Sequence, residues 1–283
     1  MRTLNIDVSD SLVAQWVGWF APLVQPFLAS ADLAGSVDEQ TVGAPLTVEV
    51  RDTYCLYGLP SGLEYVWLSE AQFRSLARPQ RAAFVRAQRS HGRELVPSVR
   101  AWADVVGDDA RAQADGHRFV WWRSLLDGRE EQVLKAYIED GRLASRHHQV
   151  PEDVWDAAAR RLPSARRHAG TFPPGSGPNC FGTVMAAAGI VGADAVWMLR
   201  EPFEHWLAEK TRPGGDDDEP GTVLVWRSPD GLVQHAAVTL GADWVLHKPS
   251  QGWMSPTKVL TTAECKASSR GSGRRLQRYT ILD

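Results

Sequence analysis

The chain has 283 residues, of which 43% are hydrophobic and 23% are charged, and its formal net charge at pH 7 is -3. This composition is that of an ordinary globular protein with one large or two small domains. The slight acidity argues against a general nucleic-acid binder or a membrane-surface binder, because both need basic patches. We therefore expect neither nucleic acid nor membrane as a partner.

The beginning of the chain does not resemble a secretory signal, because residues 1–10 are polar and of mixed charge. Residues 12–28 are rich in apolar side chains, but Gln15, Pro22 and Pro26 interrupt them. The stretch is too short and too broken to span a bilayer. The sequence therefore predicts a cytoplasmic protein.

Residues 1–165 are predicted to form a mainly helical α+β domain that recognises the substrate or caps the groove. Alternation of Val48 and Val50 with polar neighbours favours a strand over 46–56. The pattern Ser69-Glu70-Ala71-Gln72 is typical of a capping box at a helix start. The expected helices cover 9–20, 70–89 (with a possible break at Pro79), 97–106, 130–144 and 153–162, and a second strand covers 64–68.

A loop rich in Gly and Pro follows, so we place a domain boundary near residue 165 and a second domain over 166–283. The order of helices followed by antiparallel strands is typical of an α+β fold. The expected elements are a helix that opens at Cys180, a helix over 193–210, and strands over 222–226, 232–240, 244–247 and 275–282.

Three widely spaced cysteines, Cys55, Cys180 and Cys265, form neither a disulfide framework nor a zinc pattern. Cys55 is expected to be a small buried residue. Cys265 lies in a polar stretch and is expected to be exposed. Only Cys180 stands where a nucleophile could be activated, because a helix start favours negative charge and so favours a thiolate.

Two histidines complete a possible site with Cys180. His235 and His247 stand twelve residues apart on two predicted strands, and an even separation across a hairpin can direct both side chains to one face. An imidazole near a thiol can accept its proton, and a second imidazole can orient the first. The bland alternative is that all three are ordinary buried residues.

The sequence resembles the NlpC-type cysteine peptidases of the papain-like superfamily over roughly residues 170–283. The matching pieces, in order, are Asn179-Cys180-Phe181-Gly182, Pro220-Gly221-Thr222-Val223-Leu224, His235-Ala236-Ala237-Val238-Thr239-Leu240-Gly241 and Val245-Leu246-His247. The resemblance implies a helix that carries the nucleophile and packs on an antiparallel sheet. It also implies Cys180 as nucleophile, His235 as general base and acid, His247 as the residue that orients His235, and neither cofactor nor metal.

The match departs from the family at the two residues that flank the cysteine. Cell-wall members usually carry Asp and Ser there, which hold the free amine of a stem peptide, whereas this chain has Asn179 and Phe181. If those two residues bind substrate, their chemistry favours a different one. We expect a peptide or a small amide or acyl compound, cleaved through an acyl-enzyme by a peptidase, amidase or deamidase.

Three alternatives stay open from the residues alone. An acyltransferase or transamidase would use the same three residues and pass the acyl group to an amine, for example in specialised metabolism. A binding module on an inactive peptidase frame would need no chemistry. An N-terminal domain with chemistry of its own would have to use Tyr54, Cys55, Tyr57 or His91, which form no recognisable motif.

Overall fold

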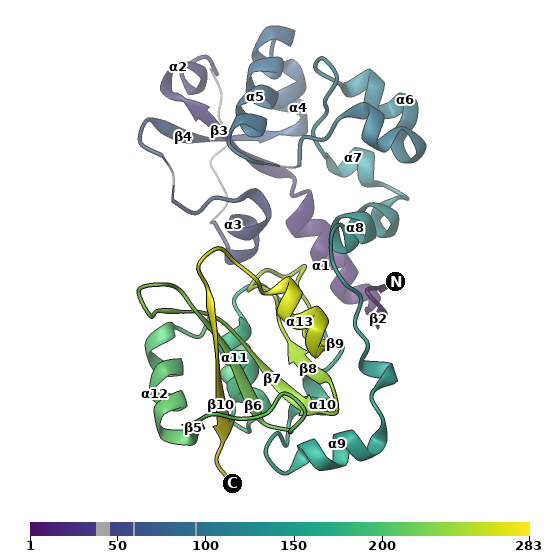
Figure 1. Cartoon of the computed structure of the whole chain (residues 1–283). Helices are drawn as coiled ribbons and strands as arrows, with labels where there is room; N and C mark the ends of the chain where they lie inside the picture. Colours follow the sequence, from purple (N-terminus) through teal and green to yellow (C-terminus); the bar gives the residue numbers. More distant parts are fainter. Residues whose placement is uncertain (38–45, 59, 94) are drawn as a thin grey trace. The chain divides into compact units, whose positions relative to one another are not determined.

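A computed structural model describes residues 1–37, 46–58, 60–93 and 95–283. It is an α+β fold of helices and antiparallel sheets that divides into two compact units (Figure 1). Unit 1 contains Met1 and Ser9–Tyr137, and unit 2 contains Arg2–Val8 and Ile138–Asp283. The division lies before the predicted boundary near residue 165, because the residues between 150 and 165 already pack in the core of unit 2.

Unit 1 is built around a two-stranded antiparallel sheet. Its strands β3 and β4 pair with Phe27 opposite Val66, and Phe27, Phe73 and Phe84 meet in the core beneath them. The elements are α1 (Asp10–Phe20), β3 (Val24–Ser30), α2 (Ala31–Ala34), α3 (Val48–Tyr54), β4 (Leu63–Ser69), α4 (Glu70–Ser75), α5 (Arg78–Ser90), the 3-10 helix η1 (Val99–Trp102), α6 (Ala103–Gln113), α7 (Arg123–Leu126) and α8 (Glu130–Glu139), whose last two residues belong to unit 2.

The helix caps predicted in unit 1 are present, but one predicted strand is wrong. Ser9 caps α1, and the Ser69 capping box is confirmed, with a helix break before Pro79. The strand predicted over 46–56 is wrong, because the chain forms α3 there. Thr47 accepts a hydrogen bond from the Val50 N–H and starts that helix, which overrides the alternation of the valines.

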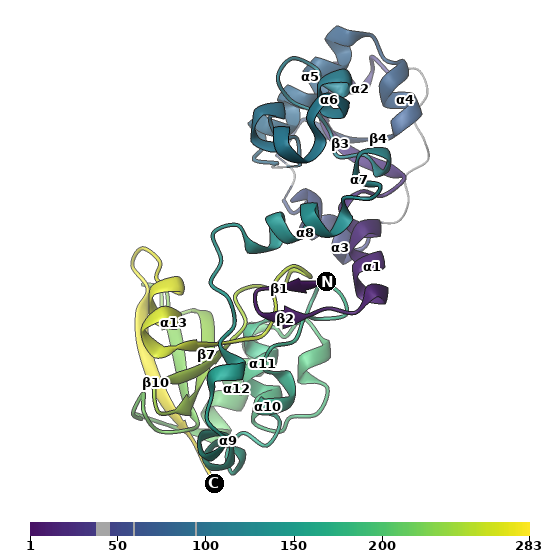
Figure 2. The same cartoon turned by 90° about the vertical axis from the view of Figure 1, so that its right-hand side faces the viewer.

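Unit 2 contains a six-stranded antiparallel sheet in the order β5-β10-β6-β7-β8-β9. Figure 2 shows its strands β7 and β10. The N-terminal hairpin β1–β2 joins this unit through the Ser145 N–H, which donates to the Leu4 carbonyl at 2.9 Å. The elements are β1 (Arg2–Thr3), β2 (Ile6–Asp7), η2 (His147–Gln149), α9 (Glu152–Ala159), α10 (Ala165–His168), α11 (Cys180–Ala187), η3 (Ala193–Ala195), α12 (Arg200–Lys210), β5 (Thr211–Pro213), β6 (Thr222–Arg227), β7 (Val233–Gly241), β8 (Trp244–His247), β9 (Lys258–Thr261), α13 (Thr262–Ser268) and β10 (Arg275–Ile281).

The two faces of this sheet bury different cores. Ala236, Val238 and Leu240 of β7 pack with α11 in the large core, which we call the α11 face. Their neighbour Ala237 packs with Cys265 of α13 in a smaller core, which we call the α13 face. This division follows from the alternation of side chains along a strand.

The strands predicted over 222–226, 232–240, 244–247 and 275–282 are confirmed, whereas β9 was not predicted. The predicted exposures of the other two cysteines are wrong. Cys55 is exposed at the end of α3, and Cys265 is fully buried in α13. Among the described residues, no helix combines the length and the apolar character that crossing a membrane requires.

Candidate active site

Cys180 is the first residue of α11, and the helix begins there because Asn179 caps it. The Asn179 side-chain oxygen accepts from the Gly182 N–H at 3.1 Å, and the Asn179 amide donates to the Met198 carbonyl at 2.7 Å. Such a cap satisfies an N–H that the first turn of a helix leaves unpaired. Asn179 therefore fixes the start of the helix, and Cys180 with it.

The Cys180 residue is buried, with 8% of its surface exposed. Burial raises the pKa of the thiol to about 11, because a thiolate would lose its hydration. The backbone N–H groups of Ala236, Phe181 and Cys180 itself oppose that rise, as does the charge of Lys248. The resting thiol is therefore protonated at neutral pH, although these backbone N–H groups favour the thiolate.

His235 and His247 lie on the adjacent strands β7 and β8 and are joined by a hydrogen bond between their Nε2 atoms of 2.9 Å. One ring must donate the proton and the other accept it. Burial lowers the pKa of His235 to about 4, with a smaller effect from Arg274, and it lowers the pKa of His247 well below the ordinary value. Both rings are therefore neutral at pH 7, and a neutral His235 can accept a proton.

The thiol and the histidines belong to opposite faces of the sheet. Cys180 and Ala236 pack in the core of the α11 face, whereas His235 pairs across the strands with Trp226, a residue of the α13 face. The Ala236 N–H is among the backbone groups that lower the pKa of the thiol, so the sulfur lies near the backbone next to His235. No hydrogen bond joins the sulfur to either imidazole in the described part of the chain.

The histidine pair also lines a pocket of about 230 Å³, together with Ser269 at the end of α13. The Ser269 Oγ lies 3.4 Å from the Nε2 of His247. Cys180 is not among the residues that line this pocket. The pocket therefore reaches the imidazoles from the side that the thiol does not occupy.

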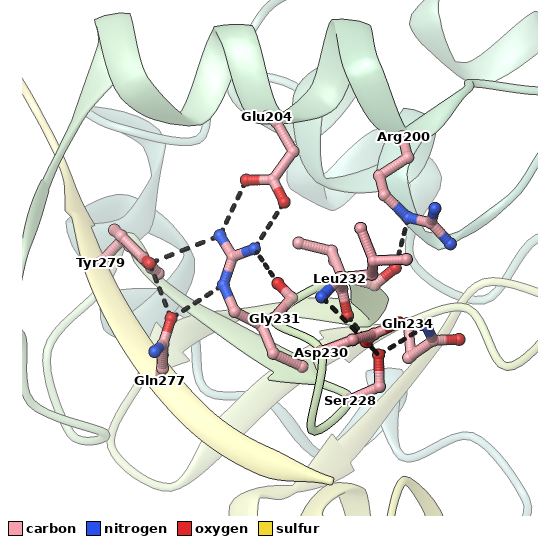
Figure 3. A network of polar contacts seen from close by, with 11 residues as sticks. Arg200, Glu204, Ser228, Asp230, Gly231, Leu232, Gln234, Gln277 and Tyr279 are labelled. Atoms are coloured by element: carbon pink, nitrogen blue, oxygen red, sulfur yellow. Dashed lines mark hydrogen bonds and ion pairs between the residues drawn. The ribbon is translucent and has the colours of Figure 1, made fainter.

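A polar network fixes the turn from which β7 starts (Figure 3). Arg227 at the end of β6 donates to the Glu204 carboxylate of α12 at 2.7 Å and to the Gly231 carbonyl in the turn at 2.9 Å. Arg200 of α12 donates to the Val233 carbonyl at 3.0 Å. These contacts tie the turn to α12 and so hold the strand that presents His235 two residues later.

The structure also places the other residues considered from the sequence. Phe181 is buried and stacks on Phe203 with a centroid separation of 4.6 Å, so its ring is part of the core. In unit 1, the Tyr54 hydroxyl donates to the Phe20 carbonyl and the Tyr57 hydroxyl to Asp52. Cys55 and His91 are exposed at the ends of two different helices, α3 and α5.

Two cations beside the histidines, Lys258 and Arg274, were not identified from the sequence. Lys258 lies on the unpredicted strand β9, and Arg274 lies just before β10. Within the described ranges, no cluster of three or more His, Cys, Asp or Glu side chains is arranged to hold a metal ion.

Comparisons with known proteins add no relative. No protein-family model matches the chain, and searches of the curated proteins and of the solved structures each found no match.

Proposed function

We propose that the chain is a cysteine hydrolase with an NlpC-type, papain-like catalytic domain that cleaves an amide through Cys180, His235 and His247. The observation that carries the proposal is the hydrogen bond of 2.9 Å between the two buried imidazoles. His235 also directly precedes Ala236, whose backbone N–H favours the thiolate form of Cys180. The position of Cys180 at the start of α11 supports it further. In this assignment His235 is the base and His247 orients it.

Acylation starts from the neutral pair. The Cys180 sulfur attacks the amide carbonyl and forms a C–S bond while its proton passes to His235. Because Nε2 of His235 is bonded to His247, Nδ1 is the nitrogen that receives this proton. The N–H of Cys180 stabilises the carbonyl oxygen as it becomes negative. The C–N bond then breaks as His235 returns the proton to the leaving amine.

Hydrolysis of the thioester completes the cycle. A water molecule gives a proton to His235 and attacks the acyl carbon, and the C–S bond breaks as the sulfur recovers a proton from His235. The thiol and His235 must meet for each transfer, although no hydrogen bond joins them in the unliganded site. Because the thiol belongs to the α11 face and His235 to the α13 face, the His235 ring has to turn toward the sulfur when substrate binds.

The surroundings of the thiol argue against recognition of a free amine there. Asn179 uses its side-chain oxygen on Gly182 and donates to Met198, and Phe181 is buried against Phe203. Neither residue supplies an anion that would pair with an ammonium group. The substrate class that fits is therefore an amide whose recognised groups lie elsewhere.

The experiment uses p-nitrophenyl acetate as a general acylating substrate. The protein should release a burst of nitrophenolate and carry one acetyl group on Cys180, located by peptide mass spectrometry. Cys180→Ala should abolish the burst while its circular dichroism and unfolding midpoint stay near those of the parent. Cys55→Ser is used as the parent, because Cys55 is the exposed thiol and would react without catalysis.

Cys265→Ala in the same parent is the matched control, because it also removes a buried thiol of unit 2. It should keep the burst. A burst of the same size in Cys180→Ala, or acetyl groups found only on other residues, would contradict the proposed function.

A further inference from the structure

The pocket beside the histidine pair is cationic. Arg142, Lys258 and Arg274 line it, and none of its lining residues is acidic. The Lys258 ammonium is buried and donates to the Leu143 carbonyl at 2.8 Å. Three positive charges around one small space repel one another, and this repulsion is relieved when an anion enters.

The effect of these charges reaches the catalytic rings. Arg274 lowers the pKa of His235, and Lys258 lowers the pKa of His247, in each case after burial as the largest cause. Burial followed by the charge of Arg142 lowers the pKa of Lys258 to about 8. The three cations and the two imidazoles therefore share one electrostatic environment.

A second observation points to a missing polar partner at the same place. The Nδ1 atom of His247 is buried and has no hydrogen-bond partner among the described residues, although His247 is only 2% exposed and lines the pocket. A buried polar atom without a partner destabilises the folded state. A hydrogen-bond acceptor such as a carboxylate that reached this atom would remove that cost.

We propose that this pocket binds the carboxylate of the amine portion of the substrate, which is the portion that leaves first. The inference rests on the proposed function, in which His235 protonates the leaving amine and so lies on the leaving-group side. Cys180 does not line the pocket, so the acyl portion is held elsewhere. A cavity of about 230 Å³ is smaller than the roughly 300–1,000 Å³ of pockets for drug-sized ligands and suits a group of amino-acid size.

Binding is measured by calorimetry on Cys180→Ala, so that no turnover intervenes. The probes are succinate, its neutral diamide and inorganic phosphate. Succinate should bind at least about tenfold more tightly than the diamide, because a hydrogen bond to a charged group is stronger than one between neutral groups. Arg274→Gln should weaken succinate binding by a similar factor, whereas Arg270→Gln, which removes an exposed arginine outside the pocket lining, should not.

Equal binding of succinate and the diamide, or unchanged binding in Arg274→Gln, would overturn the inference. Tighter binding of phosphate than of succinate would also overturn it, since the pocket would then be a phosphate site. These outcomes are separate from those of the proposed function. A protein that forms the acetyl-enzyme but binds no succinate refutes only the carboxylate pocket, and one that binds succinate without acylation refutes only the chemistry.

Discussion

The two faces of the six-stranded sheet differ in chemistry. On the α11 face, Cys180 is surrounded by a large apolar core to which α9, α11 and α12 contribute. On the α13 face, the core is small, and His235 and His247 border a cationic pocket. The proposed nucleophile therefore lies in an apolar environment and its proposed base in a cationic one.

This difference explains why the resting site is neutral. The apolar side raises the pKa of the Cys180 thiol, and burial beside positive charge lowers the pKa of His235. Both shifts oppose a thiolate–imidazolium pair. We infer that substrate binding has to bring the Cys180 thiol and the His235 imidazole together. Each of the following experiments tests one side of that division.

The largest effect is expected from His247→Ala, which removes the partner of His235 on the α13 face. Without the Nε2–Nε2 hydrogen bond the His235 ring loses its fixed orientation, so the acetylation burst should slow by about 10²–10⁴-fold. Stopped-flow absorbance of nitrophenolate gives the rate.

His205→Ala is the matched control for that variant, because His205 is an exposed histidine of α12 in the same unit and pairs with Glu209. Its burst rate should equal that of the parent. A His247→Ala protein with the same rate as His205→Ala would remove His247 from the mechanism.

The next effect is on stability in acid. Folding lowers the pKa of His235 to about 4, against 6.5 for the unfolded group. Between these two pH values, the unfolded chain therefore binds a proton on His235 that the folded chain does not. Stability is therefore full above the unfolded pKa and is lost as pH falls toward about 4. The loss from this group is about 3 kcal/mol.

Urea unfolding across this range measures the loss, with His235→Asn as the comparison because its side chain does not titrate. The variant should lose less stability than the parent between neutral pH and about pH 4. Parallel curves for the two proteins would show that His235 titrates alike in the folded and unfolded states.

A smaller effect is expected on the α11 face from Gly182→Ala. A Cβ at this position would lie 2.1 Å from the Ala193 carbonyl oxygen, so the α11 helix or the following turn must shift. Overpacking of this kind should lower the free energy of unfolding by about 2 kcal/mol. Gly18→Ala in α1 is the matched control, since nothing lies within 4 Å of its Cβ and alanine favours a helix. If both variants are equally stable, α11 is not held as tightly as this contact implies.

The sequence predicted the parts of the site that local patterns determine. The strands β6, β7 and β8 were predicted from the sequence, and the twelve-residue spacing placed His235 and His247 in neighbouring strands. The loop before Cys180 correctly indicated that a helix starts there. These features depend only on residues close together in the chain.

Other parts depend on contacts that no local pattern reveals. Lys258 and Arg274 meet the histidines only after the sheet forms. The strand β9 begins with the charged residue Lys258 and was not recognised as a strand. For Cys265 a signal was present: Thr261 and Glu264 form a capping box, which predicts α13 and allows the cysteine a buried face. The Thr47 cap could likewise have corrected the strand assigned over α3.

The smallest effect is expected from Ser269→Ala, at the boundary of the two environments. The Ser269 Oγ is 3.4 Å from the Nε2 of His247, a long contact to an atom that already bonds His235 at 2.9 Å. Its loss should change the burst rate by about threefold or less, because a contact this long contributes less than the roughly 1 kcal/mol of a normal hydrogen bond. Ser268→Ala, one residue earlier at the same pocket, should behave in the same way. A Ser269→Ala burst as slow as that of His247→Ala would mean that the hydroxyl, and not the second imidazole, sets the orientation of His235.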